Sequence, residues 1–587
     1  MQKIREQIDP SAPYLPPYTG MFEETLQAGG HTRTVILYIP EGCRACTAGV
    51  IVAGDHGTTA RELYEKSSWA DLADTEESKE KLVLLFLEPE HGVWNLQQPE
   101  NELAYIRAAY DRLACKSMFC VHESKFYMAG YGAGGTLVQM AAMDNPAVYA
   151  GIAAVSPAPV PRDYMEDVGA QLCTQLNGFQ DPSGLGICKG EVPLPVWILA
   201  DVAESYDYTP ELSYWKHALG TEDLPVALYP DTFAYIRKAE TPYPMDQEKD
   251  AYRLWFSRTD APAASYGRLM NRRIWSLFFS GVRRWMGEPC GDLRTARRPV
   301  EDLHMEYHYQ SVGGWMREWY VYIPQQVRPW QAVPLVFACH GFMCSGEIYA
   351  GNSQWHKAAD RYGFIVIFPS AATIKMEFKE ENQVISKGMM DLPAWNVFCD
   401  PKSPDELAFF TFMLNDVRKR WAVDMGRVFA TGHSMGSMMT HFLGIAAPQL
   451  FAAIAPCSGA LILGALEAFP KLEVFRRRSS VPLPVWMFGG EREEWLMPAV
   501  PEGKNLTAES IRLWCCLNGA AVPLQDFGGW TISGRWHDFC ALEDPVQVRY
   551  TWVENFPHAT NGEMTFRIWE EFFSRYYRGT DGAVHFL

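Results

Sequence analysis

The sequence predicts an α/β fold that occurs twice, as two tandem domains that are each a mostly parallel sheet flanked by helices. Two observations predict it. The chain contains an internal repeat, and short apolar, β-branched runs alternate with segments of helical periodicity. At 587 residues the chain is long enough for two such domains, and its 48% hydrophobic and 21% charged residues suit ordinary globular cores.

The repeat is clearest in the hexapeptide "VPLPVW", which occurs at 192–197 and again at 481–486. The offset is 289 (481 minus 192). Shorter pairs follow in the same order along both halves: "YIP" at 38 and 322, "HG" at 56 and 340, "WN" at 94 and 395, and "RIW" at 273 and 567. A shared order with slightly drifting offsets is typical of a duplicated unit with small loop insertions.

The predicted strands also come in pairs. The first half offers "TVILYIP", "AGVIVAGDHG", "KLVLLFLEPE", "SKFYMAGYG" and "PVWILAD", and the second offers "WYVYIP", "PLVFACHG", "FIVIFPSA", "GRVFATGHS" and "PVWMFGG". Helix-like stretches such as "SPDELAFFTFMLNDVRKRW" lie between them. Strands that alternate with helices indicate βαβ units. We expect domains at 1–290 and 303–587, joined by a polar linker around 287–302.

A candidate nucleophile lies in the second half, where residues 429–440 read "FATGHSMGSMMT" and fit G-x-S-x-G with Ser434 at the centre. The strand "RVFAT" precedes the motif and an apolar helix follows it. Gly432 and Gly436 leave room for the sharp turn that exposes the serine hydroxyl. The alternative is a serine that is buried in a turn and has no catalytic role.

The corresponding stretch of the first half, "FYMAGYGAGGTLVQM" at 126–140, has Gly132 where the serine would be. The residue that corresponds to His558, the base expected in the second half, is Ala264. Glu204 corresponds to Glu493, the expected acid, and His56-Gly57 corresponds to His340-Gly341. We therefore expect the first domain to be a degenerate, pseudo-enzyme copy without ester chemistry.

The chain order serine, acid, histidine of α/β hydrolases places the base at His558, in "YTWVENFPHATNGEMTFRIWEEFF". His537 is the rival. The acid should follow the strand "LPVWMFGG", where we favour Glu493, with Glu491 and Glu494 as alternatives.

The loop after "PLVFACHG" is expected to supply an oxyanion donor. We assign the two donors to the backbone N–H groups of Phe342 and Met435, while His340 shapes the loop. Aromatic residues on loops predicted near the site could bind an apolar acyl group: Trp395, Trp495 and Phe556, with Trp530 and Trp536 beside them.

Taken together, "VYIPQQ", "PLVFACHGFMCSGEIYA", "WHKAADRYGFIVIFPSA", "VDMGRVFATGHSMGSMMTHFLG" and "FPHA" resemble the polyhydroxybutyrate depolymerase and feruloyl or acetyl-xylan esterase group of α/β hydrolases. The resemblance covers most of residues 304–577 and, more weakly, 20–285. It implies a serine esterase that forms an acyl-enzyme, uses no cofactor, and has Ser434 as nucleophile and His558 as base. The acid, usually aspartate in that group, is Glu493 here.

The resemblance favours small or oligomeric soluble esters, with aryl and hydroxyalkanoate esters as candidates. Two other classes stay open: a prolyl-oligopeptidase-like serine peptidase, and a non-catalytic binding protein of the same fold. The sequence leaves the oligomeric state unknown.

Composition excludes other partners. The net charge of −18 opposes nucleic-acid binding. The N-terminal "MQKIREQIDPSAPYLPPYTG" has no continuous apolar core, which predicts a cytoplasmic location, and polar residues and Pro456 interrupt the most apolar stretch, 451–469, so no membrane span is expected.

Metal binding is disfavoured as well. Cys43 and Cys46 form a single C-x-x-C without a second pair, and His304, Glu306 and His308 fit the solvent face of an edge strand.

Overall fold

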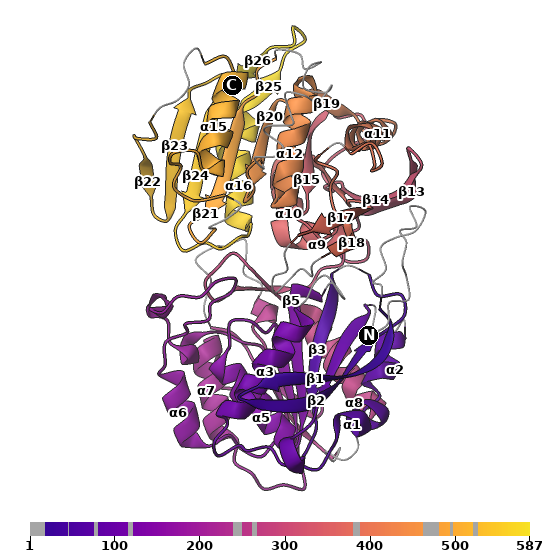
Figure 1. Ribbon diagram of the computed structural model, residues 1–587, viewed down its shortest axis with the longest axis vertical. Coiled ribbons are helices and arrows are strands. Elements are labelled where there is room, and N and C mark those ends of the chain that lie inside the picture. The colour runs from indigo at the N-terminus through magenta and orange to yellow at the C-terminus, as the bar shows by residue number, and fades with distance from the viewer. Residues whose placement is uncertain are drawn as a thin grey trace. The chain divides into compact units, whose positions relative to one another are not determined.

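The computed structural model describes residues 18–44, 46–75, 80–114, 121–238, 249–260, 267–379, 388–398, 400–461, 481–493, 497–520 and 526–587. The chain forms two compact units (Figure 1). Unit 1 comprises Leu15–Ala296 with Glu377–Met390, and unit 2 comprises Arg297–Met376 with Asp391–Leu587. The units are described separately because their positions relative to one another are not determined.

Unit 1 contains a ten-stranded sheet whose central strands are parallel and whose outer strands are antiparallel. Its strands, in spatial order, are β1 (Gly20–Ala28), β2 (His31–Ile39), β4 (Leu82–Leu87), β3 (Thr47–Ala53), β5 (Val121–Tyr131), β6 (Gly151–Val155), β7 (Val196–Asp201), β10 (Leu254–Thr259), β9 (Thr232–Tyr235) and β8 (Val226–Tyr229). The helices are α1 (Ala60–Lys66), α2 (Trp69–Asp74), α3 (Glu100–Leu113), α5 (Ala133–Asp144), α6 (Arg162–Gly169), α7 (Thr209–Leu219) and α8 (Arg268–Arg273).

Unit 2 also contains a ten-stranded sheet. Its strands, in spatial order, are β13 (Glu306–Val312), β14 (Trp315–Tyr322), β16 (Ile365–Pro369), β15 (Val333–Cys339), β19 (Val423–His433), β20 (Ala453–Cys457), β21 (Val485–Gly490), β24 (Val548–Val553), β23 (Trp536–Leu542) and β22 (Thr531–Ser533). The helices are α9 (Gly346–Ser353), α10 (Trp355–Tyr362), α11 (Glu406–Arg418), α12 (Met435–Ala446), α15 (Leu506–Leu517) and α16 (Gly562–Glu571).

The two sheets have the same order when their strands are matched along the chain. Each unit begins with an antiparallel pair, crosses to a parallel centre, and ends in two antiparallel strands. One difference is a hairpin of β17 (Thr373–Phe378) and β18 (Gly388–Pro393), which follows β16 in the chain and whose residues Glu377–Met390 are assigned to unit 1. The predicted fold class, two α/β domains with mostly parallel, helix-flanked sheets, is therefore confirmed.

The local sequence explains these elements. Central strands such as β3, β4 and β15 are buried along their whole length, as expected where helices cover both faces of a sheet. Asp405 caps α11 by accepting a hydrogen bond from the Ala408 N–H at 3.0 Å, which is where the Ser-Pro-Asp sequence predicts the helix to begin.

The predicted linker is partly ordered structure. Residues 292–295 form β12 (Asp292–Thr295), which pairs with β11 (Val282–Trp285). Leu293 is buried, and the fully buried Arg284 of β11 donates hydrogen bonds to the carbonyl oxygens of Tyr149 and Pro193. The charge of residues 287–302 indicated a linker, but Arg294 pairs with Asp292 and Arg298 pairs with Asp302, each at 2.9 Å. The chain passes from unit 1 to unit 2 after Ala296.

The remaining short strands, β25 (Tyr576–Arg578) and β26 (Val584–Phe586), pair with each other near the C-terminus. Within the described part of the chain, the model contains no helix that is both long enough and apolar enough to cross a membrane.

Candidate active site

Ser434 lies at the turn between β19 and α12. Its backbone has φ 57° and ψ −118°, a left-handed conformation that is costly for a residue with a side chain and that clusters at functional sites. Glycines on both sides permit the turn: a Cβ at Gly432 would lie 2.4 Å from the Gly436 carbonyl oxygen, and one at Gly436 would lie 2.2 Å from the Cys339 carbonyl oxygen. The spacing of G-x-S-x-G is therefore a steric requirement of this crossing.

His558 follows β24, and its Nδ1–H donates a hydrogen bond to the carboxylate of Glu493, which follows β21. The Glu493 side chain is 1% exposed, whereas that of His558 is 34% exposed. The second carboxylate oxygen of Glu493 accepts the Gly490 N–H at 2.9 Å. The acid is thus buried and fixed, and it holds an imidazole that solvent can reach.

The His558 ring also lies beside the residue that precedes Ser434, since its centroid is 4.7 Å from that of His433. Within the described residues, no hydrogen bond joins the Ser434 hydroxyl to His558. Hydrogen bonds between nucleophile and base are often long in the absence of substrate. The structure therefore brings the predicted nucleophile, base and acid to one end of the sheet.

The alternative acids and bases have other contacts. Glu491 accepts the Asn555 N–H at 2.7 Å, and Glu494 lies outside the described residues. His537 stacks on Trp552 with ring centroids 3.6 Å apart. His441 accepts a hydrogen bond from Trp514 Nε1 at 2.9 Å, and burial lowers its pKa to about 3. Of the two candidate carboxylates that the structure describes, Glu493 is the one that bonds His558.

The loop after β15 passes directly beside the serine. A Cβ at Gly341 would lie 3.2 Å from Ser434 Cβ. The preceding residue, His340, is fully buried: its Nδ1–H donates to the Gly341 carbonyl oxygen at 2.6 Å, and its Nε2 accepts the Ala371 N–H at 2.8 Å. Burial lowers the pKa of His340, which keeps the ring neutral. His340 thus orders the loop through backbone contacts.

Of the two predicted oxyanion donors, Met435 occupies the first position of α12, and its N–H has no hydrogen-bond acceptor among the described residues. Phe342 follows Gly341, and its partly buried ring packs against the core. A free N–H at a helix N-terminus suits a developing negative charge.

Two of the predicted substrate-binding aromatics are buried. Trp395 is 0% exposed and donates from Nε1 to the His340 carbonyl oxygen at 2.8 Å, and Phe556 is 1% exposed. Because a ligand could not reach either ring in this structure, we do not propose them as substrate contacts. Trp495 lies outside the described residues, Trp530 is partly buried against the core, and Trp536 is buried, with its Nε1 donating to Glu563 at 3.0 Å.

A buried ion pair, which the sequence did not reveal, lies next to the residues that support the loop after β15, the predicted oxyanion loop. Arg317 and Glu406 meet at 2.8 Å with side chains 1% and 0% exposed, and the other oxygen of Glu406 accepts the Asn396 N–H at 3.1 Å. Asn396 adjoins Trp395, which bonds the oxyanion loop. In unit 1, Arg33 pairs with the buried Glu102, which accepts the N–H of Asn95, the counterpart of Asn396.

We expect Glu406→Ala to lower the free energy of unfolding by about 3–5 kcal/mol, because Arg317 would keep a buried charge without a partner. Denaturant unfolding of the full chain measures this. The control is Glu166→Ala, which removes an exposed ion pair with Arg162 and should change stability by less than about 0.5 kcal/mol. A Glu406→Ala effect no larger than the control's would show that the pair is unimportant.

The predicted metal candidates have other contacts. Glu306 pairs with Arg420 at 2.8 Å, and the His308 ring stacks on Trp319. His304 precedes β13 rather than lying on it.

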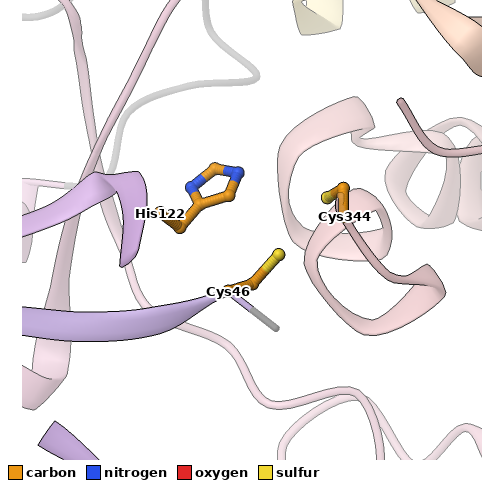
Figure 2. Close-up of side chains that lie close together, drawn as sticks. All are labelled: Cys46, His122 and Cys344. Carbon is orange, nitrogen blue, oxygen red and sulfur yellow. The ribbon is translucent and has the colours of Figure 1, made fainter. Parts of the chain in front are cut away.

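Cys46 and His122 of unit 1 have donor atoms within 4.8 Å of each other, and Figure 2 draws them with Cys344 of unit 2. Two ligands do not complete a zinc site, and the placement of the third depends on how the units sit. We therefore assign no metal to these residues.

Unit 1 keeps the shape of the turn without its serine. Gly132 has φ 54° and ψ −126°, close to the angles of Ser434. Glu204 bonds the backbone as Glu493 does, with its N–H donating to the residue three positions earlier, but its side chain is exposed. Ala264, the position matched to His558, lies outside the described residues.

Comparison with known proteins bears on unit 2. Residues 318–500 match the family model described as "Esterase PHB depolymerase". The relatives include a bifunctional acetylxylan esterase/xylanase of Neocallimastix patriciarum, 25% identical over 28% of this chain and 22% of the relative, and feruloyl esterase B of Talaromyces funiculosus, 30% identical over 26% of this chain and 39% of the relative. A solved acetyl xylan esterase from Aspergillus awamori aligns with 46% of this chain and 99% of its own, at 16% identity and a TM-score of 0.33.

These matches confirm the predicted resemblance of this part of the chain to the polyhydroxybutyrate depolymerase and feruloyl-esterase-like group of α/β hydrolases. This chain spans well under half of the length of each of the curated relatives named here.

Proposed function

We propose that unit 2 is a serine-dependent carboxylic ester hydrolase with the triad Ser434, His558 and Glu493. The observation that carries the proposal is the combination of a left-handed serine turn with an exposed imidazole held by a buried carboxylate. The names of the relatives, acetylxylan and feruloyl esterases, support ester chemistry.

The mechanism follows from these positions. Nε2 of His558 takes the proton of the Ser434 hydroxyl as Oγ attacks the ester carbonyl carbon. The N–H groups of Met435 and Phe342 stabilise the oxyanion, and Glu493 stabilises the imidazolium. Collapse of the intermediate breaks the bond to the alkoxy oxygen, which leaves as the alcohol with the proton from His558. Water, deprotonated by His558, then attacks the acyl carbon, and the bond from that carbon to Ser434 Oγ breaks as His558 returns the proton to Oγ, which releases the acid. None of these steps uses a cofactor.

The substrate that we propose is a small or oligomeric soluble ester, with aryl and hydroxyalkanoate esters as candidates. This rests on the names of the relatives and on the resemblance of the motifs. A cytoplasmic location stays a prediction from the sequence.

We further propose that the chain arose by tandem duplication and that unit 1 is a pseudo-enzyme. The equal strand orders, the equal backbone angles at Gly132 and Ser434, and the repeated buried ion pair support a common origin. Glycine at the turn removes the nucleophile from unit 1.

A panel of acyl, aryl and hydroxyalkanoate esters, assayed beside peptide amides and combined with fluorophosphonate labelling, tests the function. We expect turnover of at least one ester class, no cleavage of amides, and a single labelled peptide that contains Ser434. Amide cleavage would favour the peptidase alternative. Labelling at another serine would overturn the assignment of the site.

A further inference from the structure

The position equivalent to the nucleophile is not empty in unit 1. A Cβ at Gly132 would lie 2.3 Å from the Cγ of Asp55 and 2.4 and 2.5 Å from its two carboxylate oxygens. Because Gly132 and Ser434 have nearly the same backbone angles, the Asp55 carboxylate occupies the space that corresponds to the Ser434 side chain. Asp55 lies two residues after Ala53, which pairs with Gly130, and its structural counterpart is Gly341, two residues after Cys339, which pairs with Gly432. This match is shifted by two residues from the sequence pairing of His56-Gly57 with His340-Gly341.

The same aspartate engages the donors that correspond to an oxyanion hole. One carboxylate oxygen accepts the Ala133 N–H at 2.8 Å and the His56 N–H at 2.8 Å. Ala133 is the first residue of the 12-residue helix α5 and the counterpart of Met435. His56 corresponds to Phe342 in the structure, because Trp94 Nε1 donates to the carbonyl oxygen of Gly54, two residues before His56, as Trp395 Nε1 donates to that of His340, two residues before Phe342. Asp55 thus binds both counterpart donors.

We infer that unit 1 retains an oxyanion-type binding site and that the ligand of this site is the chain's own carboxylate, Asp55. The site therefore selects a small carboxylate and excludes an external ester carbonyl. This inference goes beyond the proposed activity of unit 2 and does not depend on it.

The first test is chemical rescue in the full chain. Asp55→Ala leaves the donors unfilled, so the peptide that contains Ala133 should exchange its amide hydrogens at least about tenfold faster. Formate at tens to hundreds of millimolar should restore the protection, while chloride at equal ionic strength should not. Asp55→Asn keeps an acceptor and fills the space, so it should respond little to formate. Glu65→Ala, which removes an exposed carboxylate from unit 1, is the matched control and should leave this exchange unchanged.

Equal effects of formate and chloride on Asp55→Ala, or unchanged exchange in that variant, would overturn the inference. A second measurement covers the case in which Asp55→Ala folds poorly. Gly132→Ala places a methyl group against the carboxylate and should lower the melting temperature, and adding Asp55→Ala to Gly132→Ala should recover part of that loss. Strictly additive losses would also overturn the inference.

Discussion

Replacing Ser434 with alanine is expected to lower ester turnover by about 10⁴-fold or more while leaving the fold intact, because the variant loses the atom that forms the acyl-enzyme. Steady-state kinetics on the best ester of the panel measures the loss, and circular dichroism checks the fold. Substrate binding should change little, since the alanine methyl group occupies part of the space of the serine side chain.

Ser437 provides the matched control. It lies one turn further along α12, and its hydroxyl donates to the Gly459 carbonyl oxygen at 2.5 Å, so Ser437→Ala should cost some stability but little activity. The Ser434→Ala variant also tests whether unit 1 has ester activity, because any turnover above background would have to come from elsewhere in the chain. Activity near that of the unmodified protein would refute both the nucleophile and the pseudo-enzyme proposals.

His558 and Glu493 are expected to act as one unit with Ser434, so their losses should be strongly non-additive. His558→Ala should cost about as much as Ser434→Ala, and Glu493→Gln should cost on the order of 10³- to 10⁴-fold, because the imidazole would lose the carboxylate that fixes and stabilises it. The double variant should be scarcely worse than His558→Ala alone.

Glu491→Ala is the discriminating comparison for the acid. Its carboxylate accepts the Asn555 N–H, so its loss should disturb the loop and leave most activity. Near-normal turnover in Glu493→Gln together with a severe loss in Glu491→Ala would move the acid to Glu491.

Many elements of this structure could be predicted from the local sequence. The predicted strands correspond to β2, β3, β4, β5 and β7 in unit 1 and to β14, β15, β16, β19 and β21 in unit 2. Except for β2 and β14, which are antiparallel to their neighbours, they are parallel to at least one neighbour and have the short continuous apolar sequences of buried parallel strands. The turn at Ser434 could be predicted from the sequence because the two glycines that it requires lie within the same five residues as the serine. Chain order predicted that a glutamate after β21 contacts His558, but it did not decide among Glu491, Glu493 and Glu494.

Contacts between residues far apart in the sequence could not be predicted. Arg317 and Glu406 lie 89 positions apart, and nothing near either one marks a buried pair. Trp395 is a loop residue, as predicted, but its ring is buried and its indole N–H donates to the His340 carbonyl oxygen. The role of Asp55 requires knowing that Gly132, 77 positions away (132 minus 55), would aim a side chain at it.

The similar backbone angles of Gly132 and Ser434 also have a thermodynamic consequence for the duplication that we propose. A left-handed conformation costs a serine on the order of 1 kcal/mol or more, whereas glycine adopts it freely. A copy that is no longer selected for turnover therefore becomes more stable when glycine replaces serine at this position. By the same reasoning unit 2 keeps a less stable turn for as long as selection for activity holds the serine there, which is a trade-off between stability and activity located in a single dihedral angle.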